Sequence, residues 1–368
     1  MESAHSNGEI FTPCDLDKSF DEVRRSSILS CFQALSTFVG NHEGLPAQAD
    51  KEAFQKCIET SSTDGSDRDN HIQNFLNSCA AKLTPLQAMF AAVGAQEALK
   101  AATGLYNPVK QILLYDCDEL LPKTPACPAD TRQTTTGLVY ILGQELEEQL
   151  KTKRLFVVGA GAIGCEILKN LAAMGFGTGK NGCIVVTDMD TIERSNLSRQ
   201  LLFRDTDIGK FKSMAAQVAI QRFNPEVKMK VHTSKVGDTG HSPFDNEFWS
   251  SDIDTVLNAL DNVEARLFID QQCVANGKAL VDAGTLGSKG NVQVVVPHQS
   301  ESYGSSVDPP EPSIPVCTLK NFPYAISHTI QWGRDLFDGL YQRRPRQAND
   351  IAASLSSIET QELARSLI

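Results

Sequence analysis

Apolar residues recur along the chain with two different periods, and the period changes after the first third of the chain. In that first third the spacing is helical in segments 22–38, 70–82 and 85–103. Thr84 is the expected N-cap of the third segment, and Gly104 is its expected C-cap. The middle of this segment is rich in Ala and Gly, so we expect it to pack closely against a neighbouring element.

Farther along the chain, short apolar runs alternate with segments of helical period. This alternation predicts an α/β fold in which a mostly parallel sheet carries helices on its faces. The predicted strands are 154–158, 183–187, 228–233, 255–259, 279–282 and 291–296, and the predicted helices are 140–151, 162–174, 211–223 and 263–276.

Two segments rich in Pro, Ser and Thr interrupt these patterns, at 121–137 and 300–315. A further helix is predicted at 323–340, and Pro323 is placed at its start, where a missing N–H is tolerated. We therefore predict three parts: residues 1–135, which are mainly helical, residues 136–300, which contain the sheet, and residues 301–368, which begin with an extended connection.

The composition is that of a folded protein and restricts its partners. Hydrophobic residues make up 41% of the chain, charged residues 21%, and the net charge is −11. An acidic chain lacks the basic surface that binds nucleic acids or anionic membranes, so we expect no nucleic acid and no membrane as partner. No apolar run approaches the ~18 residues of a membrane span, and the first residues resemble no signal peptide. We expect an intracellular protein.

The ten cysteines include no C-x-x-C pair, and a chain of 368 residues is too long for a typical disulfide scaffold. The spacing therefore indicates neither a zinc ribbon nor a thioredoxin-like site. We expect mostly buried thiols, one of which is reactive.

A glycine-rich loop, Gly159-Ala-Gly161-Ala-Ile-Gly164, follows the apolar strand 154–158 and opens a helix. Glycines at these positions allow backbone to approach phosphate oxygens, and the helix N-terminus adds partial positive charge. Many proteins with this loop bind NAD. Taken alone, the loop therefore favours an NAD-dependent oxidoreductase.

The residues that follow the next strand change this interpretation. Asp188 ends the strand, at the position where an acidic residue commonly binds ribose hydroxyls. Asp190, Arg199 and Lys212 then add a second carboxylate and two cations. A dehydrogenase needs no such set. A nucleoside triphosphate does, because cations must neutralise its phosphates and carboxylates must hold magnesium.

A third group, Asp261 and Asn262, follows the predicted strand 255–259. In open α/β sheets the carboxyl ends of the strands face the ligand crevice, so Asp261 could reach the same nucleotide and complete a magnesium site. The alternative is an Asp-Asn turn that caps the helix beginning at 263.

Together, the segments GAGAIGCE, VTDMDTIERSNLSRQ, NALDNVEAR and GTLGSKGN resemble the adenylation domain of ubiquitin-activating enzymes and their relatives. The stretch PSIPVCTLKNFPYAISHTIQW is similar to the activators of ubiquitin rather than those of SUMO. The resemblance is dense over 140–341 and weaker upstream. It implies a Rossmann-like, ThiF-like adenylation domain. A partial helical region, which corresponds to the end of an inactive adenylation half, would precede this domain, and the start of a catalytic-cysteine domain would follow it.

The resemblance implies ATP-dependent activation of ubiquitin with Mg²⁺: the ubiquitin C-terminus is adenylated and then forms a thioester on Cys317, the first step of protein ubiquitination. Ubiquitin is the implied partner, and ubiquitin-conjugating enzymes are implied partners of the complete protein. The residues implied in nucleotide binding are Gly159, Gly161, Gly164, Asp188, Arg199, Gln200, Lys212, Asp261 and Asn262, and those implied in magnesium binding are Asp190 and Asp261.

Enzymes of this family are much longer chains. We therefore expect a fragment, a truncated gene model or a shortened paralogue, and whether this chain is active by itself is left open. One alternative is a non-catalytic nucleotide-binding paralogue or interaction module. An NAD-dependent oxidoreductase, favoured only by the glycine loop, is the less favoured alternative.

Overall fold

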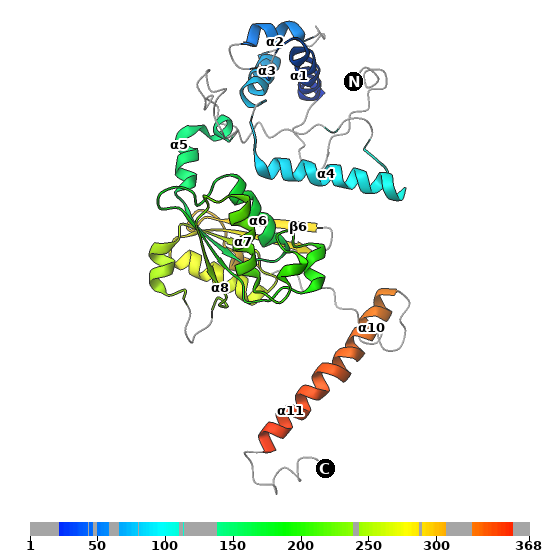
Figure 1. The fold of residues 1–368 in the computed structure, drawn as a ribbon, viewed down its shortest axis with the longest axis vertical. Coiled ribbons are helices and arrows are strands. Elements are labelled where there is room, and N and C mark those ends of the chain that lie inside the picture. The colour runs from blue at the N-terminus through cyan, green and yellow to red at the C-terminus, as the bar shows by residue number, and fades with distance from the viewer. Residues whose placement is uncertain are drawn as a thin grey trace. The chain divides into compact units, whose positions relative to one another are not determined.

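The computed structural model describes residues 22–42, 44–46, 50–58, 66–79, 81–109, 113, 138–237, 243–286, 289–306 and 326–355. The chain divides into two compact units, residues 1–305 and 306–368, and each is described by itself. Figure 1 labels the main elements.

A six-stranded sheet forms the centre of the first unit (Figure 1). Its strands are β1 Arg154–Val158, β2 Cys183–Thr187, β3 Met229–His232, β4 Thr255–Asn258, β5 Ala279–Leu286 and β6 Lys289–Val295. The order across the sheet is β3-β2-β1-β4-β5-β6; β6 runs antiparallel to β5, and all other neighbours are parallel. The predicted α/β class with a mostly parallel sheet is confirmed.

Helices precede, connect and follow these strands. They are α1 Glu22–Asn41, α2 Lys51–Cys57, α3 Ser66–Ser78, α4 Thr84–Thr103, α5 Val139–Lys151, α6 Ala162–Ala173, α7 Lys212–Phe223, α8 Val263–Ala275, α10 Ile326–Asp338 and α11 Arg344–Leu355. Short helices lie at η3 Arg194–Ser198, η4 Asp205–Asp207, η5 Phe248–Asp252, η6 Tyr303–Ser305 and η7 Gly339–Arg343. The second unit is described from α10 through η7 to α11.

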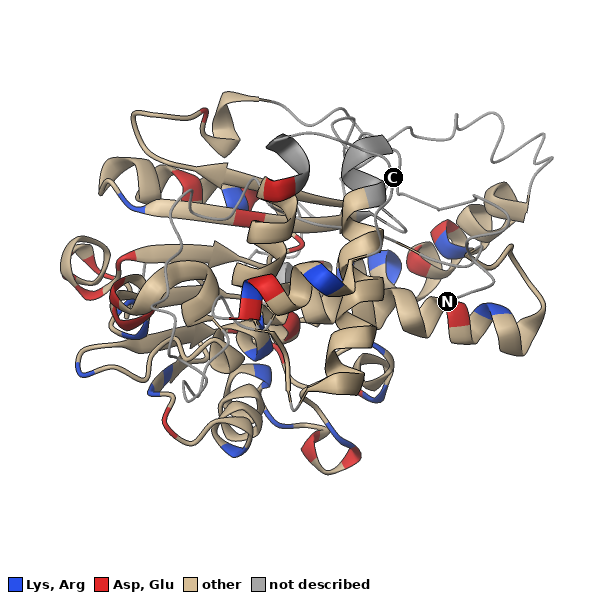
Figure 2. Ribbon diagram, turned by 90° about the horizontal axis from the view of Figure 1, so that it is seen from above, with Lys and Arg blue, Asp and Glu red and all other residues tan. Residues whose placement is uncertain are grey.

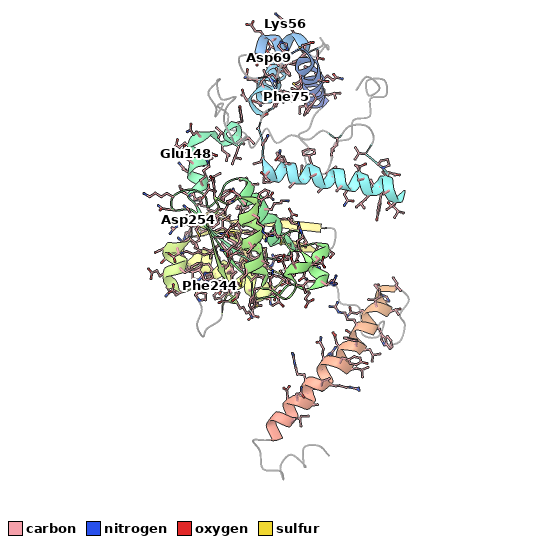
Figure 3. All side chains as sticks on the ribbon, in the orientation of Figure 1. Lys56, Asp69, Phe75, Glu148, Phe244 and Asp254 are labelled. Atoms are coloured by element: carbon pink, nitrogen blue, oxygen red, sulfur yellow. The ribbon has the colours of Figure 1, made fainter. Side chains whose placement is uncertain are left out.

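Both faces of β1 are buried, and the alternation of side chains along this strand divides them between two cores. Leu155 and Val157 lie in one core with residues of α6 and α7. Phe156 and Val158 lie in the other core with residues of α8 and with Phe244, which is labelled in Figure 3. Because side chains alternate along a strand and both faces are covered here, β1 is continuously apolar from Leu155 to Val158 rather than alternating.

Three helices at the start of the described chain have a small core of their own. The rings of Phe38 and Phe54 lie 6.0 Å apart, and those of Phe54 and Phe75 lie 5.8 Å apart. Phe75 is labelled in Figure 3. The short helix α2, which supplies Phe54, was not predicted, because seven residues are too few to show a helical period.

Helix α4 corrects two sequence predictions. Its N-cap is Leu83 rather than Thr84, although Gly104 closes it in the left-handed conformation, as predicted. It buries none of its side chains among the described residues, so the expected close packing of its Ala-rich middle is wrong there. Small residues permit a close approach but do not require one.

The chain order of the strands creates a switch point beside β1. The chain runs from β1 outward to β2 and β3, and then returns to place β4 on the other side of β1. Ligands of open α/β sheets bind at the carboxyl ends of the two strands at such a point. In this sheet those ends carry the glycine loop after β1 and Asp261 after β4.

Acidic and basic residues are interspersed along most of the described helices, as Figure 2 shows. None of the helices in the described part of the chain is long and apolar enough to cross a bilayer.

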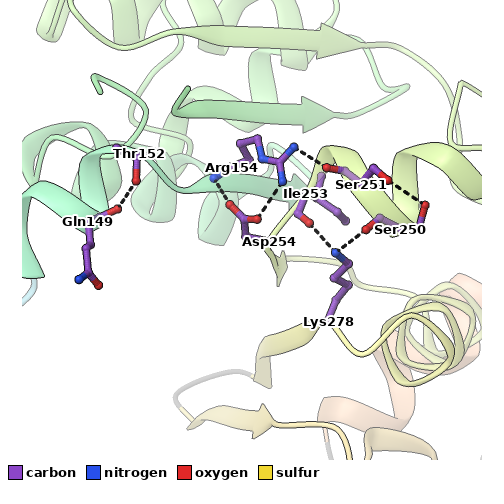
Figure 4. Close-up of polar contacts among 8 residues, drawn as sticks. All are labelled: Gln149, Thr152, Arg154, Ser250, Ser251, Ile253, Asp254 and Lys278. Atoms are coloured by element: carbon purple, nitrogen blue, oxygen red, sulfur yellow. Dashed lines mark hydrogen bonds and ion pairs between the residues drawn. The ribbon is translucent and has the colours of Figure 1, made fainter. Parts of the chain in front are cut away.

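At the amino ends of the strands, opposite the switch point, polar contacts join neighbouring strands (Figure 4). The Arg154 backbone N–H donates to Asp254 Oδ2 at 2.8 Å, and its Nη2 lies 3.0 Å from Asp254 Oδ1. Lys278 Nζ donates to the carbonyls of Ser250 and Ile253 at 2.8 and 2.9 Å. These contacts join the beginnings of β1, β4 and β5, away from the switch point.

We expect Arg154→Met to lower the free energy of unfolding by about 1 kcal/mol near neutral pH, because the ion pair is about one-third exposed. Burial alone raises the pKa of Asp254, but hydrogen bonds and charge from Arg154 lower it below its usual value. The stabilisation is therefore present above the pKa of an unfolded Asp, about 3.9, and is lost as the pH falls further. Urea unfolding over a series of pH values measures it, and a difference that persists unchanged in strong acid would contradict this account.

Candidate functional site

The glycine loop lies against the residue that follows β4. Gly159 has φ +97°, and a Cβ on it would lie 2.6 Å from the carbonyl oxygen of Ala259. Its N–H donates to Thr187 O at 2.9 Å. A side chain therefore fits neither the backbone conformation nor the space, and the loops after β1 and β4 approach each other closely because Gly159 has none.

The other two loop glycines have different roles. A Cβ on Gly164 would lie 2.1 Å from the carbonyl oxygen of Gly159, so the first turn of α6 packs directly on the loop. A Cβ on Gly161 would meet only Gln200 Nε2, at 4.0 Å. Gly161 thus borders open space beside Gln200, where the sequence predicts a phosphate.

Asp188 ties this loop to the segment after β2. Its Oδ2 accepts from the Ala160 N–H at 2.7 Å, and its Oδ1 accepts from the Asp190 N–H at 2.8 Å. Ser213 Oγ donates to its backbone carbonyl at 3.1 Å. Burial raises the pKa of the Asp188 carboxyl, and the two backbone N–H donors offset only part of that effect.

Lys212 and Asp190, predicted to contact phosphate and magnesium respectively, are brought together. Lys212 Nζ lies 2.7 Å from Asp190 Oδ2, and the Lys212 N–H donates to the Asp190 carbonyl at 2.9 Å. The lysine side chain is only 10% exposed, whereas that of Asp190 is 57% exposed. A buried ammonium beside an exposed carboxylate can exchange this partner for a phosphate oxygen at small cost.

Gln200 and Arg199 follow the short helix η3. Gln200 is buried, and its Oε1 has no hydrogen-bond partner among the described residues. Arg199 is exposed and donates to the Ser195 carbonyl at 3.0 Å. Asn196, which was not singled out from the sequence, is also buried, and its Oδ1 accepts from the Glu193 N–H at 3.0 Å. This capping contact fixes the turn that presents Arg199 and Gln200.

Asp261 and Asn262 differ in what their side chains contact. Asn262 Oδ1 accepts from the Ala265 N–H at 3.1 Å and caps α8, so the capping alternative is confirmed for Asn262. Asp261 is exposed, and no residue in the described ranges forms a hydrogen bond or ion pair with its carboxylate. It remains available for an external ligand.

The predicted magnesium ligands fit a metal ion whose coordination is completed by a nucleotide and water, rather than one enclosed by protein side chains alone. No cluster of three or more His, Cys, Asp or Glu side chains suited to a metal occurs in the described part of the chain. Magnesium commonly takes one or two carboxylates together with substrate phosphates and water. Asp190 follows β2 and Asp261 follows β4, so the two carboxylates come from the strands on either side of β1.

The predicted nucleophile, Cys317, lies outside the described residues. Six other cysteines are described, and all are free thiols. Burial raises the pKa of Cys165 to about 11 and that of Cys273 to about 12. Neither thiol is ionised near neutral pH, so neither has the character of a nucleophile.

Gly164→Ala should lower the free energy of unfolding by about 1–3 kcal/mol, because the new methyl group overlaps a backbone carbonyl that cannot rotate away. Gly161→Ala is the matched control. It should leave the thermal midpoint unchanged and weaken nucleotide binding by about tenfold, through crowding of the phosphate position. Calorimetry and equilibrium binding measure both effects. Equal stability of the two variants would contradict the packing described for the loop.

Cys165 and Cys273 should resist alkylation by iodoacetamide in the folded chain, because fewer than about one in a thousand of these thiols is ionised at neutral pH. Mass spectrometry of labelled peptides tests this, with the urea-unfolded chain as the control in which both react. Rapid labelling of either cysteine in the folded protein would contradict this account of buried, protonated thiols.

Comparison with known proteins places this arrangement in a family. The model of the ThiF family matches residues 131–367. The chain is 42% identical over 355 residues to ubiquitin-like modifier-activating enzyme 1 of Dictyostelium discoideum, with 93% of this chain and 35% of that protein covered. It is 44% identical over 343 residues to ubiquitin-activating enzyme E1 1 of Schizosaccharomyces pombe, with 89% and 34% covered.

The human ubiquitin-like modifier-activating enzyme 1 is 41% identical over 343 residues, with 89% of this chain and 32% of that protein covered. The chain thus spans about a third of the length of the relatives it matches. The similarity to ubiquitin-activating enzymes extends over about nine-tenths of the chain, and the family model includes the whole sheet. The chain belongs to the ThiF family.

Proposed function

We propose that this chain takes part in the ATP-dependent activation of ubiquitin, in which the ubiquitin C-terminus is adenylated and then transferred to Cys317. The observation that carries the proposal is the combination at the switch point of the sheet: a glycine loop, the buried Lys212, and the carboxylate of Asp261, which has no partner among the described residues. The similarity to ubiquitin-activating enzymes supports this proposal.

The residues of the site have distinct roles in this proposal. The N-terminus of α6 and the backbone at Gly161 bind the phosphates, and Asp188 binds the ribose hydroxyls. Lys212, Arg199 and Gln200 stabilise negative charge on the phosphates. Asp190 and Asp261 would hold magnesium, which would neutralise further phosphate charge when bound. The protein contributes position and electrostatic stabilisation in this step.

Two transfers follow from this arrangement. The ubiquitin carboxylate attacks the α-phosphorus of ATP, the bond to the β-phosphate oxygen breaks, and pyrophosphate leaves. The thiolate of Cys317 then attacks the carbonyl carbon of the acyl adenylate and releases AMP. One difficult acyl transfer is thereby divided into two easier steps. In the complete protein the thioester would pass to a ubiquitin-conjugating enzyme, and the expected place of action is the cytoplasm and nucleus.

A non-catalytic nucleotide-binding paralogue is the second candidate, and one observation favours it. The chain spans only about a third of the length of the relatives it matches, so most of each relative lies outside the matched length. Such a protein would bind ATP but form no adenylate.

Ubiquitin-dependent exchange of labelled pyrophosphate into ATP tests the first transfer. We expect exchange that requires both ubiquitin and magnesium, because labelled pyrophosphate enters ATP only by reversal of adenylate formation. A folded chain that binds ATP and shows no exchange would exclude catalysis by this chain and favour the second candidate.

Cys317→Ala tests the division between the two transfers. It should leave exchange within about twofold of the unchanged protein and abolish the ubiquitin thioester seen on a non-reducing gel, because the thiol acts only after adenylation. Cys57→Ala, a cysteine on α2, is the matched control and should leave both readouts intact. Loss of both exchange and thioester in Cys317→Ala alone would refute the proposed division.

A further inference from the structure

A buried ion pair lies at the carboxyl ends of the strands, next to the predicted nucleotide site. Arg266, in the first turn of α8, pairs with Asp282 of β5. The Asp282 side chain is 2% exposed and that of Arg266 is 11% exposed. The pair is far more buried than the Arg154–Asp254 pair at the other edge of the same sheet.

The guanidinium of Arg266 also binds the backbone directly before Asp261. Its Nη2 donates to the carbonyl of Leu260 and, at 3.1 Å, to that of Ala283. One side chain therefore joins α8, β5 and the loop that connects β4 to α8. The planar guanidinium can make several such bonds at once, whereas an ammonium group acts as a single point charge.

The partners of Asp282 complete this network. Its Oδ1 accepts from Asn258 Nδ2, at the end of β4, at 2.9 Å, while its Oδ2 faces Arg266. A Cβ on Gly284 would lie 2.9 Å from Arg266 Nη2 and 2.6 Å from Asn291 Oδ1, so the absence of a side chain there leaves room for the guanidinium. Both oxygens of the buried carboxylate are satisfied.

The position of Asp261 depends on this backbone. Its own carboxylate has no partner within the described residues, so nothing holds it except the loop that carries it. Backbone hydrogen bonds hold both ends of that loop, from the Ala259 N–H to the Val158 carbonyl at 2.9 Å and from the Arg266 N–H to the Asn262 carbonyl at 3.1 Å. Two side chains add to them: the Asn262 side chain caps α8, and the Arg266 guanidinium donates to the Leu260 carbonyl next to Asp261. Buried ion pairs often stabilise a fold no better than apolar packing does, so stability alone gives little reason for a pair here.

We propose that Arg266 is a positioning residue for the adenylation site: through Leu260 and Asp282 it holds the loop that presents Asp261 to the magnesium of the bound nucleotide. This inference rests on the proposed function, because it assigns a cause to the placement of a proposed metal ligand. Groups that orient a metal ligand commonly alter metal affinity by about 10- to 100-fold when removed.

The test is equilibrium binding of a non-hydrolysable ATP analogue to the full chain over a range of magnesium concentrations. Arg266→Met should raise the magnesium concentration needed for half-maximal binding by about tenfold or more, and change analogue affinity without magnesium by less than about twofold. Arg266→Lys keeps the charge beside Asp282 but not the planar donors, and should give a smaller shift. It also serves as the second variant if the methionine variant does not fold.

Arg154→Met is the matched control, because it breaks an Arg–Asp pair at the opposite edge of the sheet (Figure 4). It should keep the original magnesium dependence even where its thermal midpoint falls as far as that of the Arg266 variants. Asp261→Asn should itself raise the magnesium concentration needed for half-maximal binding of the analogue. Combined with Arg266→Met, it should show little further loss, because both changes remove the same ligand contact.

The outcomes separate this inference from the proposed function. If Asp261→Asn raises the magnesium concentration needed for half-maximal binding and both Arg266 variants leave it unchanged, the positioning role alone is overturned. An equal increase in that magnesium concentration in Arg154→Met and in the Arg266 variants would also overturn the positioning role, because a general loss of stability would then explain the increase. Unchanged magnesium dependence in Asp261→Asn would overturn both the positioning role and the metal site. Normal magnesium-dependent binding without pyrophosphate exchange would refute the proposed catalysis and leave the positioning role standing.

Discussion

The close approach of the glycine loop to the carbonyl of Ala259 is the constraint on which the rest of the site depends. Because Gly159 has no side chain, the loops after β1 and β4 lie against each other at the switch point of the sheet. Gly164 lets α6 pack on the same loop, which directs the helix N-terminus to the carboxyl edge. The packing that closes the core thus also forms the surface on which a phosphate is expected.

Electrostatics then distinguishes the kinds of nucleotide chemistry that such a loop supports. Lys212 is buried and holds Asp190, while Asp261 is left without a partner in the part of the chain that is described. A hydride-transfer enzyme has no use for a buried cation and two carboxylates around the phosphates, whereas a triphosphate that carries magnesium does. The ion pair of Arg266 and Asp282 adds a reason why the unpaired carboxylate is held in place.

The features that could be predicted from sequence are those that depend on local spacing. The bounds of β1 and β2 match the apolar runs, and the glycine spacing by itself indicates a tight loop. The contacts that could not be predicted join residues distant in sequence. Nothing in the spacing pairs Arg266 with Asp282 or Lys212 with Asp190, and the exposure of α4 depends on what covers it rather than on its own composition. The role of Cys317 and the positions of the predicted domain boundaries remain predictions.

The most direct test of the central claim, that the switch point holds a magnesium-bound triphosphate, is equilibrium binding of ATP, AMP and NAD to the same folded chain. The account predicts that ATP with magnesium binds at least about tenfold more tightly than AMP, because the cations and carboxylates act on the β- and γ-phosphates, and that NAD binds more weakly than ATP. Equal affinity for ATP and AMP, or tighter binding of NAD, would contradict it.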